Sequence, residues 1–154
     1  MIVGEEDCFW RLGKGWLSCW ASAWEWPCPG AAGDLLTPTN VVVFQLETQF
    51  ADLERFHVFA TDFTVPASGE LRITVDWTFP SDDLDLSLSN PACDATALAA
   101  GICKVFATEK SNLKPAQLTM PTTATAYRLF VFNRGPQSES GTINVTVTQT
   151  RLAV

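Results

Sequence analysis

The stretch Glu70-Leu-Arg-Ile-Thr-Val-Asp-Trp-Thr-Phe79 decides the fold class of this chain. Apolar and polar residues alternate strictly along it, which is the period of a β-strand with one buried face and one solvent-exposed face. The predicted core face consists of Leu71, Ile73, Val75, Trp77 and Phe79. A strand of this kind needs a second apolar layer to cover that face.

Similar patterns extend over the rest of the chain from Asn40 onward. Further strands are predicted at Val41–Leu46, Arg55–Ala60, Asp83–Ser89, Tyr127–Phe132 and Thr142–Thr148. Turn residues separate them, and no helix is expected between them. The segment Tyr127–Phe132 is apolar on both faces, which indicates a central strand. These features predict an all-β fold, an antiparallel jelly-roll-like β-sandwich.

Length and composition limit the class of protein. A chain of 154 residues with 47% hydrophobic and 18% charged residues is expected to form one globular core. The net charge of −7 argues against nucleic acid and against an anionic membrane surface as partners, since both need basic residues. No apolar run approaches the roughly 18 residues of a membrane span.

The first 39 residues differ from the rest, and we expect them to form a leader and linker outside the fold. They contain a group of tryptophans, namely Trp10, Trp16, Trp20, Trp24 and Trp26. Helical spacing within this group suggests a short helix over 16–24, and the interpretation we favour is a poorly ordered or short helical leader. A carbohydrate-stacking or membrane-interfacial surface is the alternative. The start lacks the basic region of a signal peptide. Residues 40–154 are the predicted domain.

The cysteines fall into two groups. Cys93 and Cys103 enclose a stretch of small residues that resembles a long loop between strands, which favours a disulfide across it. Such a bond would persist only in an oxidising compartment, and two buried thiols in a cytosolic protein are the alternative. Cys8, Cys19 and Cys28 lie in the leader, and their pairing stays open. No Cys-x-x-Cys motif is present, so zinc ribbons and thioredoxin-like sites are not indicated.

From Phe63 to Val147 the order of motifs resembles the bacterial pre-peptidase C-terminal domain. The pieces are Phe63-Thr-Val-Pro66, Ser68-Gly-Glu-Leu71, Val75-Asp-Trp77, Asp82-Asp-Leu-Asp-Leu86, the cysteine-bracketed loop, Lys114-Pro115, Tyr127-Arg-Leu-Phe-Val-Phe-Asn133 and a closing strand over 143–147. One departure is Ala124-Thr-Ala-Tyr127, which lacks the glycine that the family usually has there. The resemblance covers about residues 40–150.

This resemblance implies a secreted β-sandwich of the kind appended to extracellular peptidases. Such domains have no catalytic activity of their own, and roles in secretion or in adhesion to substrate are proposed for them. The chain has no room for a peptidase, so it would be a stand-alone copy. The implied location is extracellular or at the cell surface, with an unknown protein or polysaccharide as partner.

The residues themselves do not indicate an enzyme. The Gly-x-Ser-x-Gly motif of the nucleophile elbow is absent. The single histidine, His57, is predicted within a strand, where it would be satisfied or exposed rather than part of a catalytic pair. Acidic residues are plentiful, but no pattern selects a pair with glycosidase spacing.

The acidic residues around the predicted turn suggest a cation site. If the strands on either side of 80–82 formed a tight hairpin, Asp76 would lie opposite Asp85, and the repulsion would favour bound calcium. Asp82 and Asp83 are further candidate ligands. Solvated turn carboxylates, with Arg72 or a backbone amide as partner, are the interpretation we favour, and no cofactor is required by it.

Two functions therefore remain. The first is a non-catalytic secreted accessory or binding domain that assists adhesion to substrate or secretion. The alternative is a calcium-stabilised carbohydrate- or matrix-binding module. A surface lipoprotein or adhesin fragment is a third class, although no lipobox is visible in the sequence.

Overall fold

The structure is a computed structural model that describes residues 38–110 and 112–152. Its strands are β1 Pro38–Leu53, β2 Val58–Val65, β3 Gly69–Trp77, β4 Leu84–Ser89, β5 Val105–Glu109, β6 Ala116–Thr122, β7 Thr125–Asn133 and β8 Glu139–Leu152, and its helix is α1 Ala95–Ala99. All strand pairs are antiparallel. The predicted all-β class is therefore confirmed.

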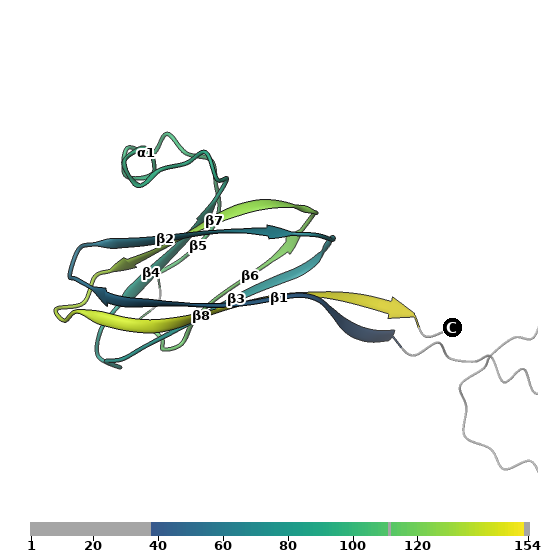
Figure 1. The fold of residues 1–154 in the computed structure, drawn as a ribbon, viewed down its shortest axis with the longest axis horizontal. Helices are drawn as coiled ribbons and strands as arrows, with labels where there is room; N and C mark the ends of the chain where they lie inside the picture. The colour runs from purple at the N-terminus through teal and green to yellow at the C-terminus, as the bar shows by residue number, and fades with distance from the viewer. Residues whose placement is uncertain (1–37, 111, 153–154) are drawn as a thin grey trace, which may run out of the picture. The chain divides into compact units, whose positions relative to one another are not determined.

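The strands form two sheets that face each other (Figure 1). One sheet has the order β1-β8-β3-β6 and the other has the order β2-β7-β4-β5. The pairs β1–β8, β2–β7, β3–β6 and β4–β5 are those of one long hairpin whose tip lies between β4 and β5. Rolling such a hairpin into two layers produces a jelly roll, so the predicted architecture is confirmed.

The core lies between the inner faces of the two sheets. Leu71, Ile73 and Val75 of β3 are fully buried there, as the alternation in the sequence predicts. The inward residues of β4 and β8 are also fully buried, namely Leu84, Leu86, Leu88, Ile143, Val145 and Val147. Burial of each such side chain contributes about 1.5–3 kcal/mol, so these alternating faces account for much of the stability.

Several sequence predictions differ from the structure in detail. Phe79 was expected on the core face, but β3 ends at Trp77, and Phe79 is partly exposed in the following turn. The strands β5 and β6 were not predicted, and α1 lies within the stretch that was read as a loop. Pro38 and Thr39 were assigned to the linker but belong to β1.

The segment between β4 and β5 covers part of the outer face of the second sheet. Phe130 of β7 is only 1% exposed, although Leu129 and Val131 on either side of it face the core. Strand alternation therefore places Phe130 on the outer face, beneath a covering segment. The loop that contains α1 lies on this side of the molecule (Figure 1). Arg128 Nη1 holds it by donating a hydrogen bond to the carbonyl oxygen of Cys93 at 2.7 Å.

The predicted leader covers residues 1–39, and its residues 1–37, including the helix predicted over 16–24, lie outside the described residues. Within residues 38–110 and 112–152, no helix has both the length and the apolar character that a bilayer crossing requires.

Candidate binding surface

The acidic residues around the β3–β4 turn do not form the hairpin that the calcium prediction assumed. β3 and β4 belong to different sheets, because the jelly-roll connection crosses from one layer to the other. The expected opposition of Asp76 and Asp85 is therefore wrong. The Asp76 carboxylate is mostly exposed and lies 3.2 Å from Lys114 Nζ.

The other three predicted ligands serve the turns at this end of the sandwich. Asp85 Oδ2 accepts a hydrogen bond from Arg134 Nε at 3.1 Å. Asp82 is only 1% exposed, and its Oδ2 accepts the amide of Gln137 at 3.0 Å. Burial and the nearby Asp85 raise the pKa of the Asp83 carboxyl, and Arg134 opposes this shift. No group of three or more acidic, histidine or cysteine side chains in the described chain is arranged to hold a metal ion.

Glu139 belongs to the same turn region and was missed in the sequence. It is fully buried at the start of β8, where its carboxylate accepts the amides of Thr78 at 2.9 Å and of Phe79 at 3.1 Å. Burial raises the pKa of Glu139 most, the two amides lower it, and Asp82 raises it further. The only sequence signal was a carboxylate next to an apolar alternating strand, which is too common to be informative.

The structure joins Cys93 and Cys103 in a disulfide. The bond closes the loop that contains α1, and the Asp94 side chain caps the helix by accepting the amide of Ala97 at 2.7 Å. Neither of these cysteines is a free thiol, so neither is a nucleophile.

His57 does not lie in a strand, contrary to the prediction. It precedes β2 in a turn where Phe56 has a φ of 64°, outside the β region. Its imidazole is exposed and lies 3.4 Å from Glu54. This position leaves His57 on a surface turn rather than in a closed site.

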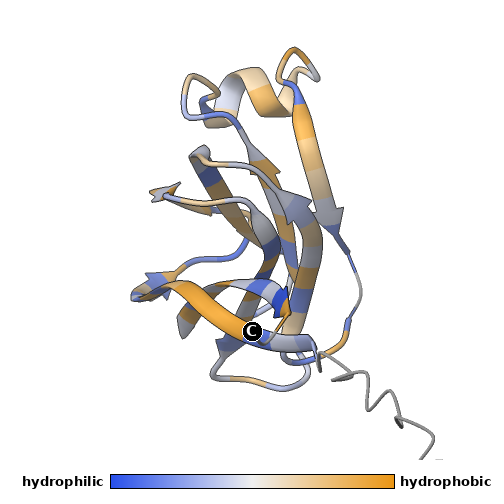
Figure 2. Ribbon diagram, turned by 90° about the vertical axis from the view of Figure 1, so that its right-hand side faces the viewer, coloured by the Kyte–Doolittle hydropathy of each residue, from blue (hydrophilic) through white to orange (hydrophobic). Residues whose placement is uncertain are grey.

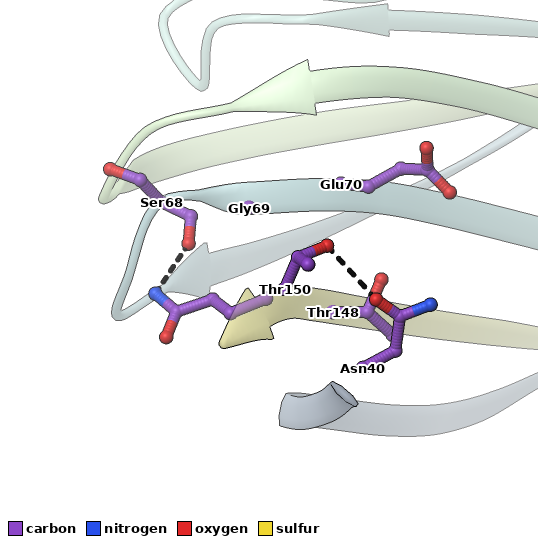
Figure 3. Close-up of a pocket in the computed structure, with 7 residues that line it drawn as sticks. Asn40, Ser68, Gly69, Glu70, Thr148 and Thr150 are labelled. Atoms are coloured by element: carbon purple, nitrogen blue, oxygen red, sulfur yellow. Dashed lines mark hydrogen bonds between the residues drawn. The ribbon is translucent and has the colours of Figure 1, made fainter. Parts of the chain in front are cut away.

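A shallow polar groove lies where the ends of β1, β3 and β8 meet (Figure 3). It has a volume of about 460 Å³ and is lined by amide, hydroxyl and carboxylate side chains, including Asn40, Glu70 and Thr148. Thr150 Oγ1 is hydrogen-bonded to Asn40 Oδ1 at 2.9 Å, and Gln149 Nε2 donates to the Ser68 carbonyl oxygen at 2.6 Å. Some of the hydrogen-bonding groups that line the groove are therefore already bonded to one another.

The surface around β5 is apolar, in contrast to the polar groove. None of the β5 residues is buried, whereas every residue of the adjacent β4 is buried. Large apolar side chains stay exposed here, with Ile102 at 80%, Val105 at 38%, Phe106 at 37% and Leu113 at 72%. In Figure 2 the start of β5, the outermost strand of its sheet, is orange, as are parts of the neighbouring α1 loop. We call residues 102–110 together with Leu113 and Lys114 the β5 surface.

Two cavities border the β5 surface. One, of about 350 Å³, lies against Val105 and Thr108 and is closed by Leu98 and Ala99 of the α1 loop and Phe132 of β7. The second, of about 400 Å³, is lined by Phe106, Met120, Pro121 and Tyr127. The rings of Phe106 and Tyr127 pack edge to face with their centres 5.5 Å apart.

Lysine side chains are concentrated on the same surface. Lys104, Lys110 and Lys114 are the lysines of the described chain, and all of them lie in or beside β5. Lys104 Nζ lies 5.5 Å from the ring centre of Phe106. Lys114 is paired with Asp76, so Lys104 and Lys110 are the cations at the two ends of β5, which itself carries Glu109.

Solved structures with a similar fold include a pre-peptidase C-terminal domain and a lysozyme inhibitor. The fold is similar to that of a pre-peptidase C-terminal domain. This domain, from a Bacillus anthracis collagenase, is 12% identical, with a TM-score of 0.47 over 68% of this chain and 89% of that chain. A periplasmic inhibitor of g-type lysozyme, PliG from Aeromonas hydrophila, is 13% identical, with a TM-score of 0.41 over 73% of this chain and 88% of that chain.

The first of these is a member of the family that the sequence resembles. No protein-family profile matches the chain, and no curated protein matches its sequence.

Proposed function

We propose that the chain is a non-catalytic binding domain of the extracellular space or cell surface, which attaches to a partner protein through the β5 surface. The observation that carries this proposal is the group of exposed apolar side chains around β5. Exposed apolar groups that gather in one place mark interaction sites, because water contact with them is unfavourable. Within residues 38–110 and 112–152, no segment covers Ile102, Val105, Phe106 and Leu113, and a partner would bury them.

The absence of catalytic activity is supported by the roles of the reactive side chains in the described chain. The two cysteines there bind each other, and His57 lies beside Glu54 on an exposed turn. Of the buried carboxylates, Asp82 and Glu139 accept hydrogen bonds from backbone amides of the turns, and Asp85 accepts one from Arg134. The disulfide supports an oxidising compartment, since such bonds are rare in the cytosol.

In this role the domain would assist a larger system by adhesion to a substrate or during secretion. Partner binding is tested with the full chain on a collagen-coated surface and on insoluble polysaccharide, each with and without EDTA. The variant pair Ile102→Ser with Phe106→Ser removes apolar area from the β5 surface. Val42→Ser removes an exposed apolar side chain from β1 and is the matched control.

We expect the full chain to be retained on collagen, the double variant to be lost and the control to be retained. Equal retention of all three proteins would contradict a role for the β5 surface.

A second candidate, a carbohydrate-binding module, is favoured by the polar groove of Figure 3. Hydroxyl, amide and carboxylate groups are those that bind sugar hydroxyls. Retention on polysaccharide that is lost in Glu70→Gln but kept in Ile102→Ser with Phe106→Ser would favour this candidate. EDTA sensitivity of that retention would add a calcium requirement.

A further inference from the structure

The strand β5 ends its sheet, so its backbone pairs on one side only. The order β2-β7-β4-β5 gives it β4 as its neighbour, and the described chain contains no strand beyond it. From Val105 to Thr108, alternate residues therefore direct peptide N–H and C=O groups away from the sheet. Such an edge is a template for an additional strand.

The side chains of an added strand would meet the two cavities already described. Val105 and Thr108 pair with Ser89 and Ser87, which alternate with core leucines, so both face outward toward the α1 loop and its cavity. Phe106 lies at a register shift of the β4–β5 pair, and its ring contacts Tyr127 of the core. It therefore points toward the second cavity, between the sheets.

An added strand would alternate regularly, whereas β5 has a register shift at Phe106. The successive side chains of the added strand would point in turn to the outer cavity and to the cavity between the sheets. Main-chain hydrogen bonds supply affinity in this mode of recognition, and alternate pockets supply specificity.

The charge of the surface indicates which segment would fit. Lys104 directly precedes β5 and Lys110 directly follows it. Their separation of six residues corresponds to about 20 Å along an extended chain. A partner segment with acidic side chains the same distance apart would place one beside each lysine.

We propose that an extended segment of a partner protein, apolar along its length and acidic at both ends, pairs with the free edge of β5 as an added strand. This inference rests on the proposed function, since it names the partner chemistry and binding mode of the β5 surface. The competing interpretation is that the lysines and the short strand protect the edge from pairing. Under that interpretation, the edge binds no strand.

The test uses the full chain and a fluorescent heptapeptide, Glu-Val-Leu-Thr-Phe-Val-Glu, with blocked ends. Two further peptides carry N-methyl groups on the odd-numbered or on the even-numbered residues. Binding is measured by fluorescence anisotropy, and the amide chemical shifts of residues 104–110 are followed by NMR. An added strand uses the N–H groups of alternate residues only.

We expect one N-methylated series to bind about tenfold more weakly or worse and the other to bind nearly as well as the parent. Shift changes should concentrate at 104–110. Equal binding of both N-methylated peptides, shifts located elsewhere, or no binding of the parent peptide would overturn the proposal.

Charge reversal tests the register. In Lys104→Glu with Lys110→Glu, the peptide with lysine at both ends should bind more tightly than the parent peptide, which reverses the wild-type preference. Arg55→Glu with Arg151→Glu changes the same number of exposed cations elsewhere and should keep the wild-type preference. An unchanged preference in the lysine variant would contradict the proposed placement.

The outcomes also separate this inference from the function on which it rests. Retention on collagen that depends on Ile102 and Phe106, together with failure of the peptide tests, would keep the binding function and overturn strand addition. Loss of both would overturn both.

Discussion

At the scale of single residues, the side chain of Glu139 joins two parts of the chain that are distant in sequence. Its carboxylate accepts the amides of Thr78 and Phe79, where β3 ends and the chain crosses to the other sheet. Burial nevertheless raises its pKa, since the charged form loses its hydration. Asp82 lies close enough to raise this pKa further.

The raised pKa of Glu139 determines the direction in which stability changes with pH. An acid whose pKa is higher in the folded state binds its proton more tightly there, so its contribution to stability falls as pH rises through that pKa. We expect Glu139→Gln to have a melting temperature near that of the wild type at pH 4 and several degrees higher at pH 8, measured by circular dichroism. If Glu139→Gln were less stable than the wild type by the same amount at pH 4 and pH 8, the buried charge of Glu139 would not be the cause of the pH dependence.

Asp62→Asn is the control, because the pKa of Asp62 is lowered by folding whereas that of Glu139 is raised. The hydrogen bonds from Arg128 lower the pKa of Asp62, so the wild type gains stability from this pair above the usual pKa of an aspartate. This gain is lost as pH falls through the lowered pKa. The variant should therefore be less stable than the wild type at pH 8 and about equal to it at acidic pH.

The acidic turn also shows what residue-level prediction could not provide. The sequence shows carboxylates but not their partners, which come from far along the chain: Arg134 for Asp85 and Gln137 for Asp82. The favoured interpretation was solvated carboxylates with Arg72 or a backbone amide as partner. The kind of contact is right, but the arginine is Arg134, and Asp82 and Asp85 are buried rather than solvated. Only the fold brings these groups together.

At the scale of elements, the alternation of apolar and polar residues predicted strands that have at least one buried face, although both faces of β4 are buried. β3, β4 and β8 each have a buried face and were found, whereas β5 has no buried residue and therefore no period to detect. β6 does alternate, with Ala116 and Leu118 buried. It was not predicted because it contains Pro121, and proline within a strand pattern argues against a strand unless it lies at a sheet edge. The hairpin between β3 and β4, on which the calcium site was conditional, does not form, because these sequence neighbours belong to opposite sheets.

The close packing of β8 between β1 and β3 gives a second prediction. Gly141 lies opposite both Phe50 and Trp77, and a Cβ atom there would collide with the Asp76 carbonyl oxygen and the Phe50 ring. We expect Gly141→Ala to lower the free energy of unfolding by about 1–3 kcal/mol, since the backbone oxygen cannot move away cheaply. Urea denaturation followed by fluorescence measures this change.

Gly101 is the matched comparison for Gly141. A Cβ atom there would meet nothing within 4 Å, but its φ of 69° favours glycine. Gly101→Ala should therefore cost about 1 kcal/mol, through backbone strain alone. A larger loss at Gly101 than at Gly141 would contradict the proposed importance of the strand contact.

The disulfide gives the prediction for the α1 loop. Closing a loop of about ten residues restricts the unfolded chain, so Cys93→Ser with Cys103→Ser should lower the free energy of unfolding by about 2–4 kcal/mol. The loop over Phe130 should also become more sensitive to protease. Mass spectrometry of a non-reduced digest identifies the linked peptides, and recovery of both cysteines as thiols from an oxidising compartment would contradict the bond.

At the scale of the whole molecule, the jelly roll is closed by its two ends. β1 and β8 are the longest strands, and their pairing runs from Pro38 with Leu152 to Leu53 with Glu139. This long pairing brings together residues that are 86 to 114 positions apart in the sequence. Folding of such a topology is expected to be slow, in the range of milliseconds to seconds, because long loops must close before these contacts form.

Every strand of both sheets in the described part of the chain lies between Pro38 and Leu152, so we expect the sandwich to be complete without the preceding residues. We expect deletion of residues 1–37 to change the melting temperature by only a few degrees. Deletion of residues 1–43 should lower it substantially, because it removes the part of β1 that pairs with β8 from Leu152 to Thr148.

Both deletions leave Trp77 as the only tryptophan of the chain. Its indole is buried and donates a hydrogen bond to the Phe79 carbonyl oxygen at 2.9 Å, so its emission reports directly on the core beside β8. In the shorter deletion, we expect Trp77 to keep blue-shifted emission and to melt in one cooperative step. If deletion of residues 1–37 lowered the melting temperature as much as deletion of 1–43, the boundary between leader and domain would be wrong, because the leader would then supply stability that the sandwich lacks.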